Sequence, residues 1–250
     1  VGLQLFGSSI EKTVKAIGII EKVADYDILD INLGCPVGKV TKTGAGSSWL
    51  ARPDELEKYM KAVVESSHKP VTAKIRLGKD DKSINVWEVA KMLEKVGVKM
   101  ITVHARTAAQ MYAGVPDFEC IRGLGQSLSI PLCISGDIFT PDDAVRAMEI
   151  TGAKLVMVAR GGLGNPRLVT NINNRFEGKE EFPKPTLFEQ ASWAKTFSTM
   201  LIDQLGERVA VNQLRGLIPH FFSGFPGYKK IRGQISTTIK TTEDLYKILD

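Results

Sequence analysis

The chain has 250 residues, 43% hydrophobic and 24% charged, a globular composition that excludes a disordered protein. Its 33 Lys and Arg exceed its 28 Asp and Glu, and the formal charge of +5 suits a polyanionic partner without requiring one. Three scattered cysteines without a C-x-x-C pair argue against a disulfide framework and a zinc site, and no apolar run is long enough to span a membrane. We therefore expect a soluble cytoplasmic protein without a metal or a membrane anchor.

Short β-type apolar runs alternate with amphipathic stretches, a pattern that predicts βαβ units and a parallel sheet. Strands are expected at Gly2–Phe6, Ile28–Leu33, Val71–Arg76, Met100–His104, Pro131–Ser135 and Leu155–Ala159. Helices are expected at Glu11–Val23, Pro53–Ser66, Ile84–Val96, Phe118–Leu124, Pro141–Glu149 and Arg167–Phe176.

Six such strand–helix units favour a (β/α)₈ TIM barrel. A barrel needs eight units, and Val1 already lies at the edge of a strand, so we expect the first two units to be missing from this chain. The alternative is an open, doubly wound sheet of six strands.

After Phe182 the character of the sequence changes. A segment punctuated by Pro183 and Pro185 leads into further helical patterns. These lie at Leu187–Leu205, Val209–Phe222 and Glu243–Leu249. We therefore predict a barrel domain at residues 1–182 and a small all-helical domain at 183–250.

Active sites of TIM barrels are built at the C-terminal ends of the strands. The expected strand ends carry Gln4, Asn32 with Cys35, Lys74 with Arg76, His104 with Arg106, Ser135-Gly136-Asp137 and Arg160-Gly161-Gly162. A full ring of polar strand ends indicates one ligand-sized site. The last two ends are Gly-containing turns that run towards helices, where backbone N–H groups bind phosphate.

Lys74 and His104 end neighbouring strands. Cations beside a planar heterocycle hold the negative charge of a reduced flavin, so this pair and the phosphate turns together indicate FMN. The alternatives are a partly buried lysine paired with a carboxylate and a core histidine whose hydrogen bonds are satisfied.

Cys35 lies where a strand breaks into a Gly-rich loop, at the mouth of the predicted barrel. A thiol with a pKa of about 8.5 is mostly protonated at neutral pH and can act as a general acid. A nucleophile and an inert loop thiol are the alternatives.

The stretch Ile31–Gly46, INLGCPVGKVTKTGAG, resembles the tRNA-dihydrouridine synthase family. The segments VTAKIRLG, HARTAAQMYAGVPDF and ARGGLGNP are similar to further signatures of that family, and the resemblance runs from Gln4 to about Tyr228. It implies an FMN-dependent barrel that reduces the C5–C6 double bond of a uridine in tRNA, with NADPH or NADH as reductant. The partner would be tRNA, with the uridine flipped out, and no obligatory protein partner.

The resemblance also implies roles for single residues. Cys35 would protonate C5 of the uracil while hydride reaches C6 from reduced FMN, and Asn32 and Arg106 would lie near the uracil. The residues implied to hold the flavin are Gln4, Lys74, His104, Ser135, Gly136, Asp137, Ala159 and Arg160, with Asp137 shaping the turn rather than touching phosphate.

In the helical domain, basic side chains are candidates to contact tRNA phosphates, although they also suit a solvated face. These are Arg215, Lys229, Lys230 and Arg232. The aromatic residues Phe221, Phe222, Phe225 and Tyr228 are expected to form the core of this domain rather than a stacking surface.

The sequence departs from the family pattern in places. Ser135 stands where the family more often has Asn, and Ala159 stands where it more often has Gly, although both turns keep their backbone character. Two other functions remain open: an FMN barrel acting on a free base, of the dihydropyrimidine or dihydroorotate dehydrogenase kind, and a non-catalytic RNA-binding protein.

Overall fold

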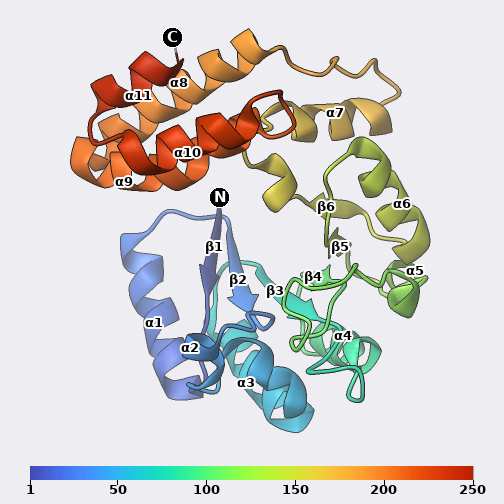
Figure 1. Cartoon of the computed structure of the whole chain (residues 1–250). Helices are drawn as coiled ribbons and strands as arrows, with labels where there is room; N and C mark the ends of the chain where they lie inside the picture. The colour runs from blue at the N-terminus through green and yellow to red at the C-terminus, as the bar shows by residue number, and fades with distance from the viewer. Residues whose placement is uncertain (250) are drawn as a thin grey trace. The chain divides into compact units, whose positions relative to one another are not determined.

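The computed structural model describes residues 1–249 and divides them into two compact units (Figure 1). The first unit comprises residues 1–138 and 142–158, and the second comprises residues 139–141 and the chain from Ala159 onward. The predicted domain boundary after residue 182 stays a prediction.

The first unit is built on a six-stranded parallel sheet in the order β1-β2-β3-β4-β5-β6. Its strands are β1 (Gly2–Leu5), β2 (Ile28–Asn32), β3 (Val71–Arg76), β4 (Met100–His104), β5 (Leu132–Ser135) and β6 (Leu155–Met157). All six predicted strands are therefore confirmed. Because the strands follow one another in chain order, the sheet has no switch point, and the doubly wound alternative is wrong. A sequential parallel sheet is the arrangement of part of a (β/α)₈ barrel.

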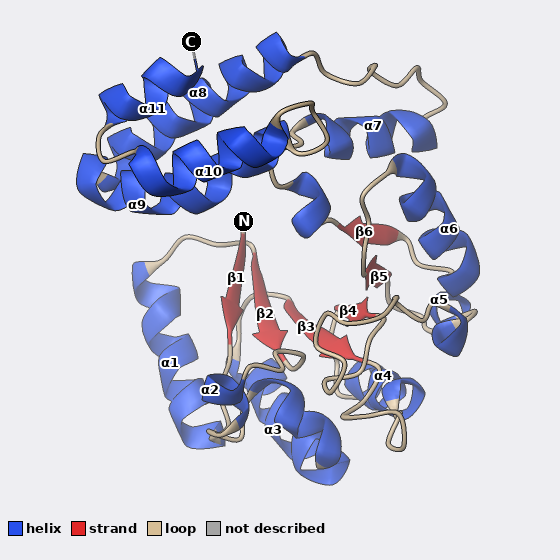
Figure 2. Cartoon of the chain, viewed as in Figure 1, coloured by secondary structure: helices blue, strands red, loops and turns tan. Residues whose placement is uncertain are grey.

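Helices lie along the outer side of the curved sheet (Figure 2). They are α1 (Ile10–Val23), α3 (Pro53–Ser66), α4 (Val86–Lys95), α5 (Leu124–Ser127) and α6 (Pro141–Thr151). The start of α1 is fixed by Ser9, whose Oγ accepts a hydrogen bond from the Lys12 N–H at 3.3 Å. The expected helix Phe118–Leu124 is wrong: a 3₁₀ turn, η2 (Glu119–Ile121), stands there, and Gly123 at φ 77° interrupts the chain before α5.

The strands separate apolar from polar side chains by simple alternation, because successive residues of a strand point to opposite faces. In β3, Ala73 and Ile75 are fully buried, while Thr72, Lys74 and Arg76 lie at the alternate positions. The other strands follow the same rule, with the fully buried residues Leu29, Ile31, Ile101, Val103, Leu132 and Ile134. The opposite, inner face carries the polar residues.

The segment between β2 and α3 is held by close backbone packing. It contains the short elements α2 (Gly38–Thr41) and η1 (Gly46–Ala51). Trp49 Nε1 donates to the Gly7 carbonyl oxygen at 2.9 Å, and the Trp49 ring stacks on Tyr59 with centroids 4.6 Å apart. Gly46 lies at φ 60°, and a Cβ there would stand 2.6 Å from the Cys35 carbonyl oxygen. The loop that carries Cys35 therefore packs directly on Gly46.

The second unit is helical. It contains η3 (Arg160–Gly162), α7 (Arg167–Phe176), α8 (Leu187–Leu205), α9 (Glu207–Leu217), η4 (Ile218–Phe222), α10 (Tyr228–Thr238) and α11 (Thr242–Leu249). Phe221 and Phe222 are buried in its core, as expected, and Tyr228 packs against that core. None of the helices within residues 1–249 combines the length and the apolar character needed to cross a membrane.

Helix α10 was not predicted, because its sequence is basic and polar. Its position is fixed by Ile235 and the following Ile239, which are buried, and by the partly buried Ile231. This spacing of four residues puts the three isoleucines on one helix face. The same spacing, visible in the sequence, could have predicted the helix.

Replacing Gly46 with alanine tests the packing of the Cys35 loop. We expect Gly46→Ala to lower the free energy of unfolding by about 2 kcal/mol or more, because the residue lies at positive φ and the new Cβ meets the Cys35 carbonyl oxygen. The matched control is Gly38→Ala, where a Cβ meets no atom within 4 Å, and we expect a change of at most about 0.5 kcal/mol there. Urea unfolding measures both, and equal effects would contradict the packing argument.

Candidate active site

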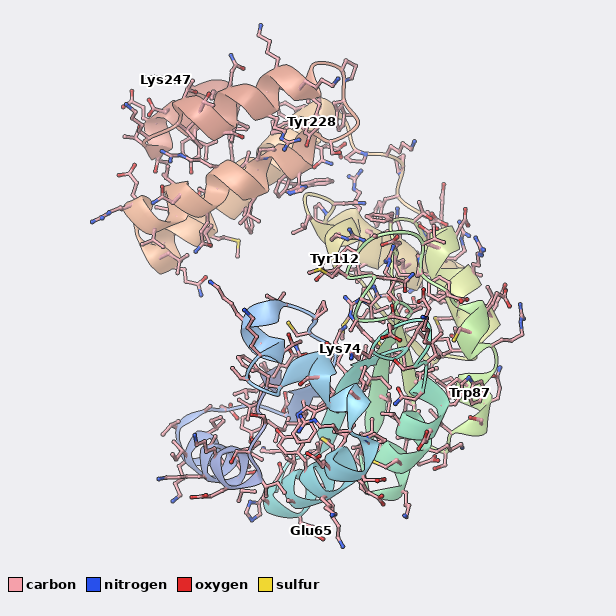
Figure 3. All side chains as sticks on the ribbon, turned by 60° about the horizontal axis from the view of Figure 1, so that its bottom comes forward. Glu65, Lys74, Trp87, Tyr112, Tyr228 and Lys247 are labelled. Atoms are coloured by element: carbon pink, nitrogen blue, oxygen red, sulfur yellow. The ribbon has the colours of Figure 1, made fainter. Side chains whose placement is uncertain are left out.

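The inner face of the sheet brings the predicted polar strand ends of the first unit together. The register sets Asn32 beside Lys74 on β2 and β3, and Arg76 beside His104 on β3 and β4. It also sets His104 beside Ser135 of β5. Lys74 and Tyr112 are labelled in Figure 3. The predicted site residues of β1 to β5 therefore belong to one continuous surface.

Cys35 lies directly beyond β2, and its backbone is fixed by Asn32. The Asn32 Oδ1 atom accepts hydrogen bonds from the N–H groups of Gly34, at 3.2 Å, and Cys35, at 2.9 Å. A side chain on Gly34 would stand 3.2 Å from the Ile75 backbone, so glycine lets this turn lie close against β3. The Cys35 side chain is partly buried.

Lys74 is a partly buried cation. Burial lowers the pKa of its ammonium, and the neighbouring charge of Arg76 lowers it further, whereas Asp30 acts in the opposite direction. Among residues 1–249 the ammonium forms no ion pair, so the paired-lysine alternative does not describe this structure. The Lys74 ammonium therefore lies on the inner face without an ion-pair partner among residues 1–249.

Arg76 is only 2% exposed and holds the loop that follows β4. Its Nη1 donates to the carbonyl oxygens of Thr107, at 2.8 Å, and Met111, at 2.7 Å. Its guanidinium also lies over the Tyr112 ring, 5.6 Å from the centroid. Tyr112 is 54% exposed, so the loop presents an aromatic side chain with a guanidinium packed against it.

Arg106 is 1% exposed, and all five of its N–H groups have acceptors within the protein. Nε and Nη2 donate to the carbonyl oxygens of Ala113, at 3.1 Å, and Gly114, at 2.7 Å. Nη1 and Nη2 bind the Asp137 carboxylate at 3.0 and 2.5 Å, and Nη1 also lies 3.4 Å from His104 Nε2. This guanidinium is therefore engaged by the protein itself, and direct substrate binding by Arg106 stays a prediction.

His104 does not carry the positive charge expected from the sequence. Burial lowers its pKa to about 3, and the nearby cations Arg76, Lys74 and Arg106 contribute to the shift. The ring is 8% exposed and lies 6.2 Å from the Tyr112 ring between centroids. The expectation of two cations is therefore corrected at His104, which is a neutral group that can donate or accept a hydrogen bond.

The turn after β5 adopts a conformation that requires its glycine. Gly136 has φ 137°, and a Cβ there would stand 2.9 Å from Pro116 Cβ. Asp137, at φ 45°, accepts both hydrogen bonds from Arg106, which agrees with its expected role in shaping the turn. Ala159 and Arg160 belong to the second unit, where Arg160 begins η3 and its guanidinium lies 5.9 Å from the Phe139 ring centroid.

Comparisons with known proteins identify the family. The family model described as dihydrouridine synthase (Dus) matches residues 1–249. The chain belongs to the dihydrouridine synthase family. A probable tRNA-dihydrouridine synthase 1 of Synechocystis sp. is 41% identical over 83% of this chain and 58% of the relative. A probable tRNA-dihydrouridine synthase of Mycobacterium tuberculosis is 34% identical over 99% of this chain and 64% of the relative.

The chain spans about three-fifths of the length of the curated relatives it matches. Solved structures are more distant. A histamine dehydrogenase from Rhizobium sp. 4-9 shares 17% identity over 69% of this chain and 28% of that chain, with a TM-score of 0.48. The family assignment therefore rests on the sequence matches.

Two features of the site were not predicted from the sequence. The first is Asp30, which lies on the same face as Asn32. Its carboxylate accepts hydrogen bonds from Gln4 Nε2 and from Thr72 Oγ1, each at 2.6 Å. The second is the role of Arg76 in holding the loop after β4, because the sequence identified this residue only as a polar strand end. The signal for Asp30 was an acidic residue inside an otherwise apolar strand, two positions before Asn32.

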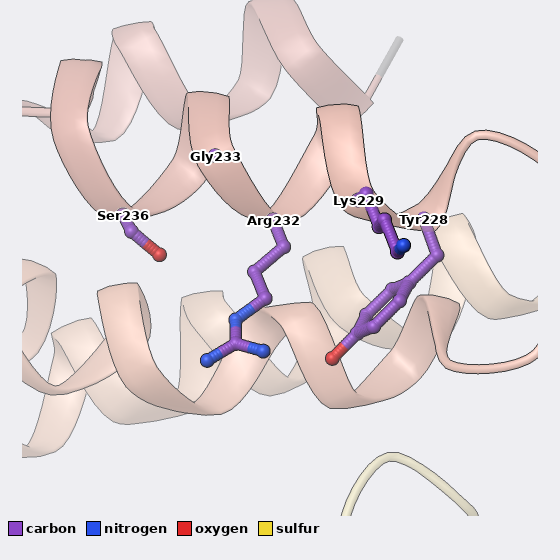
Figure 4. Close-up of a pocket in the computed structure, with 5 residues that line it drawn as sticks. All are labelled: Tyr228, Lys229, Arg232, Gly233 and Ser236. Carbon is purple, nitrogen blue, oxygen red and sulfur yellow. The ribbon is translucent and has the colours of Figure 1, made fainter.

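The helical unit contains an open hollow of about 580 Å³ on α10 (Figure 4). It is lined by Tyr228, Lys229, Arg232, Gly233 and Ser236. Arg215 differs from the other predicted basic residues, because its Nε and Nη2 donate to the Ile239 carbonyl oxygen at 2.9 and 2.6 Å. Arg215 therefore holds the end of α10, and Lys229 and Arg232 are the cations at the hollow.

The neutral state of His104 predicts a pH dependence of stability. The unfolded chain binds a proton near pH 6.5, but folded His104 binds one only near pH 3. As the pH falls below about 6.5, the unfolded state therefore binds more protons, and the protein loses at most about 1.4 kcal/mol per pH unit from this group.

We expect His104→Asn to remove this part of the slope, measured as urea unfolding between about pH 7 and pH 5. Thr102→Val, on the same inner face, is the control and keeps the slope. An unchanged slope in His104→Asn would show that the folded histidine is protonated.

Proposed function

We propose that the protein carrying this chain is a tRNA-dihydrouridine synthase, which reduces the C5–C6 double bond of a uridine in tRNA. FMN would be its bound flavin, and NADPH or NADH its reductant. The observation that supports this most directly is the placement of Cys35 within its family-specific stretch, with its backbone held by Asn32 next to Lys74. The completion of the sheet as an eight-stranded barrel belongs to the same proposal.

The residues of the inner face fit a flavin. The ring needs a cation beside it to hold negative charge on reduction, and Lys74 is partly buried with no ion-pair partner in residues 1–249. Gln4 and Asn32 offer amide groups on the same face, and His104 offers a neutral hydrogen-bonding ring. The Ser135-Gly136-Asp137 turn is the proposed phosphate site in this unit, and Ala159 and Arg160 remain proposed cofactor residues.

Reduced FMN, when bound, would supply the hydride for C6 of the uracil. Cys35 is the proposed general acid that gives its thiol proton to C5. Asn32 accepts a hydrogen bond from the Cys35 N–H, and this bond fixes the backbone from which the thiol side chain extends. Tyr112, supported by Arg76, offers a flat face on which a flipped base can stack.

Arg106 is proposed to influence substrate binding through the loop it holds. Its donors fix the carbonyl oxygens of Ala113 and Gly114, on the C-terminal side of Tyr112, while Arg76 fixes Met111 on the other side. The exposed tyrosine is thus anchored from both ends. The resemblance named Arg106 as a uracil contact, and the geometry favours this indirect role.

The helical segment at residues 183–250 is proposed to bind tRNA. Lys229 and Arg232, at the hollow on α10, would contact phosphates, and Tyr228 lies beside them with one side packed on the core. Such contacts add affinity for a polyanion and would place the uridine by holding the rest of the tRNA.

Replacing Cys35 tests the proposed reaction. In the full-length protein loaded with FMN, we expect tRNA lacking dihydrouridine to reoxidise the reduced flavin rapidly, and Cys35→Ala to slow this step by about 10²- to 10⁴-fold, the usual contribution of a general acid. Anaerobic stopped-flow absorbance of the flavin measures the rate.

Cys120→Ala is the matched control, because Cys120 is also a partly buried free thiol but lies in η2, away from the inner face. It should leave the rate unchanged. Reoxidation by free uracil or orotate as fast as by tRNA would favour the free-base oxidoreductase instead. A fully flavin-loaded protein that responds to neither would favour the non-catalytic RNA-binding protein.

Removing a cation from the hollow tests tRNA binding. We expect Arg232→Ala to weaken tRNA affinity and to reduce the slope of log K against log salt by about 1, as for one lost phosphate contact. Lys247→Ala removes the same charge from α11, where Lys247 pairs with Glu243 at 2.7 Å, and should leave the slope unchanged. Filter binding at several salt concentrations measures both, and identical slopes for the two variants would contradict a role of the hollow.

A further inference from the structure

A chain of three polar side chains runs along the inner face of β1 and β2 to the Cys35 backbone. Gln4 Nε2 donates to Asp30 Oδ2 at 2.6 Å, and Asn32 Nδ2 donates to Gln4 Oε1 at 2.9 Å. Asn32 Oδ1 then accepts the N–H groups of Gly34 and Cys35. The chain therefore connects a carboxylate to the backbone of the residue proposed as proton donor.

The carboxylate at one end and the two backbone N–H groups at the other require the same direction for every hydrogen bond in this series. An ionised carboxylate only accepts hydrogen bonds, so Gln4 must turn its NH₂ group towards Asp30 and its oxygen towards Asn32. Asn32 must in turn direct its NH₂ group to Gln4 and its oxygen to the loop. Each amide has a single orientation that satisfies all partners, and that orientation provides the acceptor that the two backbone N–H groups need.

Asp30 is itself fixed from its other side. Thr72 Oγ1 donates to Asp30 Oδ1 at 2.6 Å, so both carboxylate oxygens are engaged. The register explains the arrangement, because Asp30 lies between Gln4 on β1 and Thr72 on β3. The three strands together hold the carboxylate at the start of the chain.

Reversing the direction of these hydrogen bonds would disrupt the loop that carries Cys35. If Gln4 turned its oxygen towards residue 30, its NH₂ group would face Asn32, and Asn32 would then point its own NH₂ group at the N–H groups of Gly34 and Cys35. Donors would face donors, and both backbone N–H groups would lose their acceptor. Asp30 excludes this state because it has no proton to donate.

We propose that Asp30 is a positioning residue, whose carboxylate sets the orientation of the Gln4 and Asn32 amides and so holds the Gly34–Cys35 backbone in place. Its importance for catalysis rests on the proposed function, in which Cys35 is the proton donor. The hydrogen-bonded chain itself does not depend on that function.

Amide hydrogen exchange in the Asp30→Asn variant tests this role. Asparagine can donate to the Gln4 oxygen and so permits the reversed chain, while its size is almost unchanged. We expect exchange at the Gly34 and Cys35 amides to become about tenfold faster. The Leu33 amide is the internal reference, because it donates to the Lys74 carbonyl oxygen at 2.8 Å and should stay within about twofold.

A second variant moves the carboxylate from position 30 to position 4, the next side chain in the hydrogen-bonded series. In Asp30→Asn combined with Gln4→Glu, the new Glu accepts from both neighbouring amides, so Asn32 must again direct its oxygen to the loop. We expect slow exchange at Gly34 and Cys35 to return. Thr72→Val is the control, because it removes a partner of Asp30 but keeps the carboxylate, and it should leave both rates within about twofold.

Three outcomes would overturn the proposal: slow exchange at Gly34 and Cys35 in Asp30→Asn, equal acceleration at Leu33, or no recovery in the double variant. The exchange rates require no turnover. Failure of the Cys35→Ala test with flavin and tRNA would therefore reject the proposed function and leave the role of Asp30 standing. Failure of the exchange test alone would reject the role of Asp30 and leave the proposed function standing.

Discussion

The alternation of side chains along six parallel strands is the constraint on which the rest of the first unit depends. One set of positions must be apolar because it is covered by helices, and the other set is then free to carry polar groups along the inner face. Since neighbouring strands are in register, a polar residue at one strand end lies beside a polar residue at the next. A site that draws on several strands follows from this alternation without any long-range loop.

Four basic side chains lie on or beside the inner face, and they differ in their hydrogen-bond partners. Lys74 has no ion-pair partner among residues 1–249, Arg76 and Arg106 donate to loop carbonyl oxygens, and His104 is neutral. Buried guanidinium groups are stable only when their donors are satisfied, and here backbone carbonyls and Asp137 supply the acceptors. The same interactions that satisfy the arginines order the loop bearing Tyr112.

Sequence patterns predicted what depends on local order. The six strands follow from apolar runs, and Asn32 and Cys35 were found together because they are three residues apart. The neutral state of His104 was missed because it depends on burial, and then on cations from β3 and the loop after β4 that only the fold brings near the ring. Arg215 was a candidate to contact phosphate, and its hydrogen bonds to Ile239 could not be foreseen because Ile239 lies at the end of a helix that the polar sequence concealed.

Two loops border the inner face, and they are held by opposite hydrogen-bonding chemistry. The loop after β4 offers carbonyl oxygens, and cationic guanidinium groups are their donors. The loop after β2 offers N–H groups, and an amide chain that begins at a carboxylate is their acceptor. Because a guanidinium only donates and a carboxylate only accepts, neither loop can be held in the reversed sense. The positions of Tyr112 and Cys35 are therefore fixed by groups with a single hydrogen-bonding polarity. This explains why charged residues lie on strands β2 and β3 and directly after β4, at positions that do not themselves have to touch a substrate.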